Sequence, residues 1–427
     1  MHNEPFMKRQ KVIYKSKFRF GYGLTGNNRV SDFAYLPSVQ KKHYYSMNNA
    51  TPSIASTISS FGNSALKWET TTFYNLAYEL GLFKQRIDLT FELYRKNTDD
   101  LLLRKNMPYS SGMATETMNI GSIRNDGFEI TLNTINIRTP KFQWNSDFNI
   151  AFNRNRILKL ADRENNMLSN VGFGANFSDV PLYIARVGGP AASFFGLICD
   201  GVYQLSDFDM VDGNYVLKSH IADNGGTKGK AGIKPGDIKY RDINGDGTIN
   251  DYDKVVLGRC QPIHTGGFNN NFVYGNLSLN IFFQWAYGHD LMNANRIVFE
   301  GDYMMNRSIN QLASYADRWS MDNQDSKNYR AGGAGPRGFW SSRTIEDGSY
   351  LRLKTVNLTY SLPQKIVNKI KLASLAITVS GQNLWTWTNY SGLDPEVSTR
   401  HSILTPGFDY SAYPRNRIFS LGIKATF

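Results

Sequence analysis

Residues 72–96 read TFYNLAYELGLFKQRIDLTFELYRK, and the alternation in this segment decides the fold. Two limbs flank the central GLFK, and apolar and polar side chains alternate along each limb. Successive side chains of a β-strand point to opposite faces, so each limb is a strand with one apolar face and one polar face. The apolar faces carry Tyr74, Leu76, Tyr78 and Leu80 on the first limb and Ile87, Leu89, Phe91 and Leu93 on the second.

Two environments can produce such a hairpin. A soluble antiparallel sheet packs its apolar face on a core and leaves the polar face in water. A transmembrane β-barrel turns the apolar face to lipid and the polar face to an aqueous lumen. The hairpin alone leaves both interpretations open, so the rest of the chain has to separate them.

The same alternation recurs along the chain and predicts about ten strands. From Phe18 onward, the connections between the strands alternate strictly between long and short. Outer-membrane barrels have short periplasmic turns and long extracellular loops, whereas a soluble sandwich has no reason for this rhythm. The predicted strands are 18–24, 72–80, 86–93, 128–137, 142–153, 266–274, 277–287, 350–361, 375–387 and 417–427.

The sequence therefore predicts an all-β fold, an antiparallel transmembrane β-barrel with long extracellular loops. Its lipid face is expected to include the odd residues from Ile87 to Leu93 and the even residues from Phe142 to Phe152. The last strand agrees, because its apolar residues share one face and the chain ends on the aromatic Phe427.

The longest connection, residues 154–265, shows no sustained period of either kind. Other long connections are residues 25–67 and the stretch that ends at Ser349. Within the last of these, Asn310–Trp319 has apolar residues at helical spacing and predicts a short helix. In the strand 350–361 the apolar phase slips between Leu353 and Val356, which predicts a β-bulge.

Composition narrows the class of protein. No apolar run approaches the ~20 residues of a membrane helix, while 24 Tyr and 26 Phe make the chain rich in aromatic residues. The net charge of +12 comes from scattered Lys and Arg, so nucleic acid is not an expected partner. Residues 1–8 contain no apolar segment of the kind a signal peptide needs. This predicts either a cytosolic protein or a fragment of a longer exported chain.

The sharpest chemical signal is DINGDGTINDYD at residues 242–253, inside the long loop region 154–265. Its oxygen-bearing side chains follow the spacing of a calcium-binding loop, with glycine at the sixth position for the sharp turn. We therefore expect a structural Ca²⁺ in an extracellular loop. The alternative is a loop of Asx turns that keeps its shape without metal. The predicted ligands are Asp242, Asn244, Asp246, Asp253 and the carbonyl of Thr248.

The remaining reactive side chains predict no catalytic site. Cys199 and Cys260 lack metal-ligand spacing, and either one disulfide or two unpaired residues would fit them. The six His residues are scattered, so we expect no enzyme and no catalytic cofactor. Trp385, Trp387 and Tyr390 could stack on sugar rings at the barrel mouth, but aromatics at a strand's outer end more often form an interfacial girdle.

A series of short blocks, in order along nearly the whole chain, resembles the C-terminal part of the SusC/RagA-type TonB-dependent transporters of Bacteroidetes outer membranes. No single block is specific to this family, but the number of blocks and their order along the chain are specific to it. The blocks are FGYGLTGN at 20–27, LKWETT at 66–71, NIGSIRNDG at 119–127, PGDIKYRD at 235–242, YLRLK at 350–354, GQNLW at 381–385 and GLDPE at 392–396.

The resemblance implies that residues 1–427 form about ten C-terminal strands of a 22-stranded barrel in the outer membrane. Such a barrel holds an N-terminal plug, imports oligosaccharides or peptides, and is surrounded by outer-membrane lipid. The resemblance also implies a SusD-like surface lipoprotein over the opening and energy from TonB–ExbB–ExbD. Relative to this pattern the chain lacks the signal peptide, the TonB box, the plug and the first half of the barrel. A fragment not competent alone is therefore expected.

Two other classes of function compete with this one. A secreted, dockerin-like calcium-dependent interaction module would explain residues 242–253, which resemble a dockerin repeat. Against it, the loop occurs once and residues 254–258 are too short for the helix that should follow. A soluble β-rich glycan-processing enzyme would need a pair of acid and base residues, and the sequence offers none in a recognisable setting.

Overall fold

The computed structural model describes most of the chain, and its gaps are short. The N-terminal stretch from which the absence of a signal peptide was predicted lies, apart from Glu4, outside the described residues. The described residues are 4, 10, 12–28, 32–46, 49, 51–107, 109–112, 115–161, 164–173, 177–301, 309–336, 340–400 and 402–427.

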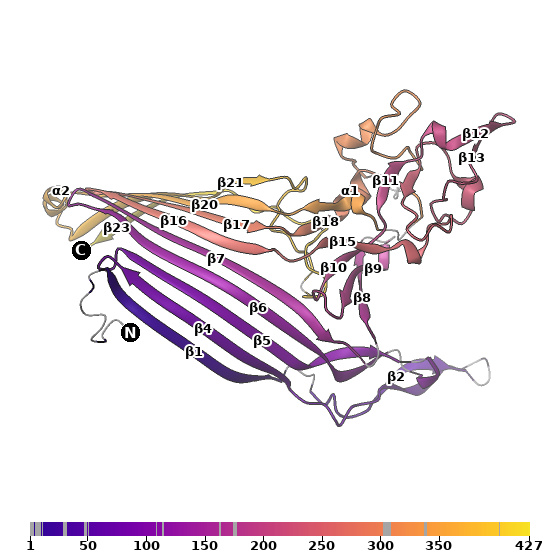
Figure 1. Ribbon diagram of the computed structural model, residues 1–427, viewed down its shortest axis with the longest axis horizontal. Helices are drawn as coiled ribbons and strands as arrows, with labels where there is room; N and C mark the ends of the chain where they lie inside the picture. Colours follow the sequence, from indigo (N-terminus) through magenta and orange to yellow (C-terminus); the bar gives the residue numbers. More distant parts are fainter. Residues whose placement is uncertain are drawn as a thin grey trace.

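One antiparallel ten-stranded sheet forms the body of the molecule (Figure 1). Its strands lie side by side in the order in which the chain visits them, without crossovers. This confirms the predicted number and kind of strands. The strands are β1 (Ile13–Asn27), β4 (Glu69–Leu82), β5 (Ile87–Asn106), β6 (Thr115–Arg138), β7 (Phe142–Lys159), β16 (His264–Tyr274), β17 (Leu277–Tyr287), β20 (Tyr350–Ser361), β21 (Ser374–Thr388) and β23 (Ile418–Thr426).

Several strands extend well beyond their predicted ends on the side of the long connections. β6 begins at Thr115 rather than at residue 128, and β5 runs on to Asn106. The two strands remain paired there, with register shifts between Thr98 and Leu102. Alternation in the sequence requires two faces in different environments. In these extensions the run Leu101–Leu103 and its polar neighbours break the alternation, so backbone hydrogen bonds continue the strand while the sequence shows no period.

The predicted bulge is confirmed. The pairing of β20 with β17 shifts where the consecutive residues Phe282 and Phe283 lie opposite Thr355 and Leu353, so Lys354 is the extra residue of β20. The pairing of β20 with β21 shifts at the same level, where β21 has one residue more than β20 between the pairs Leu353–Trp385 and Thr355–Gln382. An extra residue reverses the phase of the side chains, which explains why the apolar pattern slips there.

The long connections contain short strands, contrary to the irregular structure that the sequence suggested. Most of these strands have four residues or fewer, which is too short to show a period of two. They pair as β2 (Ser38–Tyr45) with β3 (Ser53–Ser60); β15 (Val255–Arg259), β10 (Ser193–Gly196), β9 (Phe177–Arg186) and β8 (Asn166–Phe173) in one sheet; β11 (Cys199–Val202) with β14 (Ile238–Tyr240); β12 (Phe208–Val211) with β13 (Asn214–Leu217); and β19 (Ile345–Asp347), β18 (Asp290–Asn293) and β22 (Phe408–Asp409).

The helices are short, and the one predicted from periodicity is wrong. Asn310–Trp319 contains only a 3₁₀ turn, because the Trp319 N–H bonds to the Asn328 carbonyl across the loop instead of continuing a helix. No helix in the described residues has the length and apolar character to cross a membrane. The α-helices are α1 (Ala294–Phe299) and α2 (Gln364–Lys369); the 3₁₀ turns are Tyr109–Ser111, Leu205–Asp207, Gly229–Gly232, Asp251–Asp253, Ala313–Asp317 and Ser342–Thr344.

The packed cores lie in the long connections and not on the sheet. The first loop core surrounds Trp340 and Phe194 and joins residues from three long connections, those between β7 and β16, β17 and β20, and β21 and β23. The second loop core surrounds Ile249 and Trp319. In Figure 1 these connections form a folded body at one end of the sheet, opposite the short turns and both chain ends.

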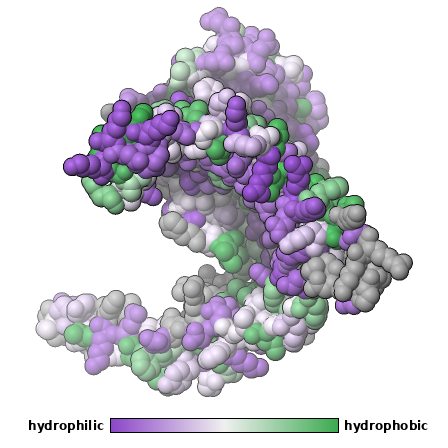
Figure 2. Space-filling model, turned by 90° about the vertical axis from the view of Figure 1, so that its left-hand side faces the viewer, coloured by the Kyte–Doolittle hydropathy of each residue, from purple (hydrophilic) through white to green (hydrophobic). Residues whose placement is uncertain are grey.

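The sheet is strongly curved and open along one side. Seen from the end with the short turns, the molecule is a C-shaped trough (Figure 2). β1 bonds only to β4, and β23 only to β21, so each presents one unpaired edge within the described residues. The curvature is that of a barrel wall, and the two edges are where the wall stops.

The two faces of the sheet give the first testable prediction. Leu89 lies opposite Leu132, and Leu132 opposite Phe148, in the middle of the apolar band. Leu89→Arg should cost ~2–4 kcal/mol of folding free energy near the bilayer midplane, whereas Thr90→Arg on the polar face should cost much less. Urea unfolding in lipid vesicles measures both. Equal losses in folded, membrane-embedded protein would contradict the assignment of the faces.

Candidate functional site

The outer face of the sheet is an aromatic and aliphatic surface. Rings contact one another from strand to strand around the curve: the stacked pairs are Phe91 with Phe128 at 6.4 Å, Phe128 with Phe152 at 6.3 Å and His264 with Tyr287 at 5.1 Å, and Phe152 meets His264 in a tilted pair at 5.3 Å. Leu93, in the same band, is 51% exposed. Large apolar side chains exposed in a continuous band are suited to lipid and not to water. This confirms that the predicted lipid face is the outward one.

The inner face of the sheet carries charges and amides. Near the β1 edge, Glu79 bonds to both Lys15 and Arg19 at 2.6 Å, and Arg19 also approaches Glu92 at 3.8 Å. Asn75 donates a short hydrogen bond to Glu92. Because these groups line the concave side, the trough has the polar wall of an aqueous lumen.

Farther around the trough, asparagines take over from the charged pairs. The Asn269 amide donates to Asp147 at 3.1 Å, and the Asn280 amide donates to the side-chain oxygens of Asn269 at 2.6 Å and Asn271 at 2.7 Å. The lumen wall therefore offers both charges and neutral amide groups to a polar solute.

A buried arginine joins the wall to the last long loop. Arg352, on the inner face of β20, is only 2% exposed. Its guanidinium contacts Asp394 at 2.6 Å, Glu396 at 3.0 Å and Thr386 at 3.0 Å. Arg415, from the end of the same loop, contacts Glu396 at 3.2 Å. These bonds hold residues 389–417 against the strand that carries Arg352.

This cluster unites two of the sequence blocks, YLRLK and GLDPE, across more than forty residues of chain. The sequence identified both blocks only through the family resemblance and did not predict their contact. One available signal was a charged residue on the inner face of a strand, since such a charge needs a partner when it is buried.

The three aromatics considered for sugar stacking separate into two environments. Trp385 and Trp387 point outward and are about half exposed, as interfacial girdle residues are. Tyr390 is buried in the loop, where its hydroxyl donates to Asp409 at 2.6 Å. Burial, and then the Asp409 carboxylate, raise the pKa of Tyr390 well above its usual range. The structure does not bring the three together.

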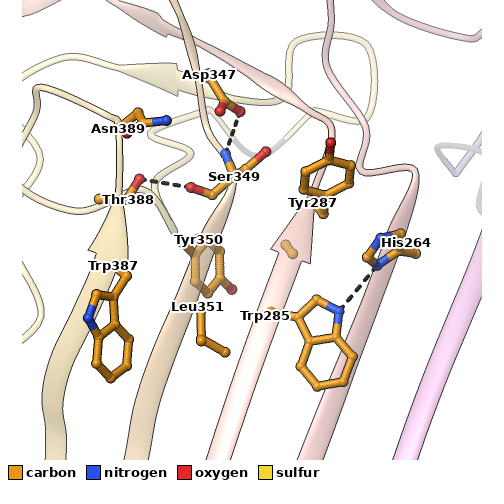
Figure 3. Close-up of a pocket in the computed structure, with 11 residues that line it drawn as sticks. His264, Trp285, Tyr287, Asp347, Ser349, Tyr350, Leu351, Trp387, Thr388 and Asn389 are labelled. Carbon is orange, nitrogen blue, oxygen red and sulfur yellow. Dashed lines mark hydrogen bonds between the residues drawn. The ribbon is translucent and has the colours of Figure 1, made fainter.

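Trp387 also borders a cavity of about 570 Å³, which lies where β16, β17, β20 and β21 meet the long connections (Figure 3). Trp285 and Trp387 stand on either side of Leu351, and the Trp285 N–H donates to His264 Nδ1 at 3.2 Å. Above them, Asp347 accepts the Ser349 N–H at 2.9 Å. The cavity therefore has an apolar floor on the lipid side and a polar upper rim.

The predicted calcium ligands lie in one loop but divide into two groups. Asp242, Asn244 and Asp246 form successive turns in which their side-chain oxygens accept loop N–H groups at 2.7–3.0 Å. Asp253 is fully buried; its Oδ1 accepts from Ile243 at 2.9 Å and its Oδ2 from Asn250 at 2.8 Å.

These contacts alone would hold the loop in shape, as the Asx-turn alternative requires. A carboxylate has about four lone-pair sites, so Asp242 and Asp246 retain acceptor capacity. The Thr248 N–H, and then the Asn244 amide, lower the pKa of Asp246, which keeps this carboxylate ionised. Within the described residues, no group of three or more His, Cys, Asp or Glu side chains converges as metal ligands do.

The two cysteines are free. Cys199 lies beside the second loop core and Cys260 inside the first, so the disulfide that the sequence left open does not form. Burial raises the pKa of both thiols, which keeps them protonated and unreactive.

The exposed apolar face, the polar lumen wall and the alternation of loop lengths define the class: this chain is the barrel wall of an outer-membrane protein. The family description "TonB dependent receptor-like, beta-barrel" matches residues 37–235. The chain is 31% identical to TonB-dependent receptor P3 of Formosa agariphila over 432 residues, which is 100% of this chain and 41% of that protein. It is 27% identical to SusC of Bacteroides thetaiotaomicron, over 99% of this chain and 39% of that protein.

The fold agrees with these matches. The structure of the RagAB peptide transporter superposes with a TM-score of 0.76 at 23% identity, covering 100% of this chain and 42% of that one. The chain therefore belongs to the TonB-dependent receptor β-barrels, is similar in sequence to SusC and in fold to the RagAB transporter, and resides in the outer membrane. It spans about two fifths of the length of the curated relatives that it matches.

The Arg352 cluster yields a prediction about the last long loop. Arg352→Met should cost about 3 kcal/mol, the lower end of the range for breaking a buried ion pair, because Asp394 and Glu396 keep some contact with water. Residues 389–417 should become sensitive to added protease. Arg415→Met, which removes a more exposed partner of Glu396, is the matched control and should cost less than about 1 kcal/mol. Equal sensitivity of both variants would contradict a role for Arg352 in holding this loop.

Proposed function

We propose that this chain forms the C-terminal wall of a TonB-dependent importer of polar oligomers, either oligosaccharides or peptides. The observation that carries the proposal is the arrangement of the two faces of the sheet. Apolar side chains point outward and charges and amides point inward, which is the reverse of the arrangement in a water-soluble protein. A lumen lined by Glu79, Glu92, Asp147 and the asparagine chain would keep a hydrated, hydrogen-bonding cargo solvated during passage. The family is one of transport receptors and not an enzyme class.

The wall would be completed by other strands to the 22 of the family. An unpaired backbone group in lipid costs several kcal/mol, so the free edges of β1 and β23 need partners. Ten strands alone would close only a narrow barrel that side chains largely fill, which does not suit so many lumen charges. Energy would come from TonB–ExbB–ExbD through segments outside this sheet, and a SusD-like lipoprotein would cover the loop end.

The secreted dockerin-like alternative receives no support. Its calcium loop would have to be followed by a helix, but residues Val255–Arg259 form strand β15, which pairs with β10 inside the loop body. The loop is thus built into the loop body at one end of the sheet and does not form a separate module.

Completion of the barrel can be tested directly. Residues 1–427 are exported with a signal peptide, either alone or joined to the plug and first strands of a related transporter. The joined protein should form a heat-modifiable, protease-resistant barrel and take up labelled glycans or peptides in a TonB-dependent manner. A resistant barrel and energy-dependent uptake from residues 1–427 alone would contradict the proposal.

We also propose that residues 242–253 bind Ca²⁺ and stiffen their extracellular loop. The proposal is supported by the ionised Asp246 and by the spare lone pairs of Asp242, Asn244 and Asp246, with the Thr248 carbonyl as a further ligand. Asp253 would instead hold the loop backbone in shape, because its carboxylate accepts the N–H groups of Ile243 and Asn250. It would bind the ion only if a bond to calcium replaced one of these hydrogen bonds.

Calorimetry of the detergent-solubilised protein tests this proposal. Ca²⁺ should bind with a dissociation constant of about 10⁻⁴–10⁻³ M, typical of extracellular modules, and protect the loop from protease. Asp246→Ala should abolish both effects by removing a ligand. Asp251→Ala, an exposed acid of the same loop that pairs with Lys254 at 2.8 Å, should leave them intact. No heat and no protection at millimolar Ca²⁺ would show that the Asx turns suffice.

A further inference from the structure

A basic surface begins where the apolar band of β5, β6 and β7 ends. In cross-strand register, the apolar row Leu93, Phe128 and Phe152 is followed, two residues nearer the loops, by Arg95, Asp126 and Arg154. The next row carries Arg124 and Arg156. Residues two apart on a strand share a face, so these side chains lie on the outward, lipid-facing side of the sheet.

The height of this surface matches the outer headgroup layer. The even residues from Phe142 to Phe152 span ten steps of β7, or about 34 Å along the strand. A tilt of roughly 40° reduces this to about 26 Å, close to the ~25 Å apolar band of outer-membrane barrels. Arg154 and Arg156 therefore lie just above the hydrocarbon on the side of the long loops, which is extracellular in such barrels.

The arginines differ in whether their charge is already neutralised. Arg95 bonds to Asp126 at 2.6 Å, so these two charges cancel. Arg154, Arg156 and Arg259 are all exposed, and none has a carboxylate partner among the described residues. Asp290 accepts the backbone N–H of Arg259 at 2.7 Å, which leaves the guanidinium available.

These three arginines border one cavity, and Asp126, whose charge is paired with Arg95, also lines it. It has a volume of about 530 Å³ and lies between the upper end of β7, the turn Gly188–Pro190 and residues 259–262, where β7 extends beyond its neighbour β16. Asn155 contributes to its wall through hydrogen bonds to Gln261 and to the Ala191 N–H. In Figure 1 this is where β7 meets the loop strands β8–β10. The cavity is therefore anchored on both the sheet and the loop body.

We propose that Arg154, Arg156 and Arg259 bind a phosphate group of a glycolipid in the outer leaflet, with its acyl chains lying on the stacked rings of Phe91, Phe128 and Phe152 below. Guanidinium groups bind phosphate oxygens in bidentate fashion, and several arginines can share one dianion. A cationic cavity directly above an exposed aromatic surface matches a molecule with an anionic head and apolar chains. A soluble anion could bind to the arginines of the cavity, but it would make no apolar contact with the stacked rings below.

The experiment uses the membrane-extracted protein in the assembly in which it occurs. It is incubated with lipid A, with the same lipid after removal of its phosphates, or with inorganic phosphate, and bound lipid is counted by native mass spectrometry. Phosphorylated lipid A should be retained at least tenfold better than the dephosphorylated form, and inorganic phosphate should not displace it. Equal retention of the two lipids by the unaltered protein overturns the proposal without any variant. Displacement by inorganic phosphate identifies a soluble anion site and overturns it as well.

Variants locate the site on the surface. Arg154→Gln with Arg156→Gln should reduce retention of phosphorylated lipid A at least tenfold, and Arg154→Lys with Arg156→Lys should restore part of it. The matched control is Arg138→Gln with Lys141→Gln. It removes two exposed charges from the short turn that joins β6 to β7, at the opposite end of β7 from the cavity. This control should retain lipid normally. Heat-modifiability on a gel shows that each variant is folded, and an equal loss in the control overturns the assignment to this cavity.

Discussion

The structure depends on the need of every peptide group in the hydrocarbon layer to find a hydrogen-bond partner within the protein. Nine consecutive antiparallel pairings meet this need across the ten strands. The pairings are in simple chain order, and the short turns fix every second one of them, because such turns join adjacent antiparallel strands. The same need makes the edges of β1 and β23 the least stable part of the wall, and it is the physical reason for expecting further strands beside them.

The sheet and the loop body bury opposite kinds of side chain. On the sheet, Phe20 is 73% exposed, while Asn75 on the other face is buried. In the loop body, Trp340, Tyr183 and Phe194 are buried in a conventional core. The difference follows from the solvent, since lipid offers apolar side chains a favourable surface and water does not. The protein can therefore pack a water-facing domain on top of a wall that has no core of its own.

The Arg352 cluster shows how these two parts are joined. A guanidinium buried in the wall would be costly without partners, and the loop supplies two carboxylates. The cost of separating them ties residues 389–417 to β20. The first loop core acts in the same direction, because Phe408 from this loop packs with residues from two other long connections. The loops thus have a defined position above the lumen, as selection of a cargo would require.

The sequence by itself determined the ten strands, their order, the bulge in β20 and the orientation of the two faces. These features depend on side-chain alternation within the chain and on the lengths of the connections, both of which are local. It also indicated the family, through blocks spread along the whole chain, and it located the loop at residues 242–253.

Only the tertiary structure decided what the long connections do. Most of their strands are too short to show a period, and of the helically spaced residues Leu312, Tyr315 and Trp319 only Trp319 belongs to the second loop core. Distance in the chain likewise hid the contact of Arg352 with Asp394 and Glu396, the separation of Cys199 from Cys260, and the convergence of Arg154, Arg156 and Arg259 on one cavity. Alternation reports which face a residue occupies, but only the folded chain shows which residues from distant segments meet there.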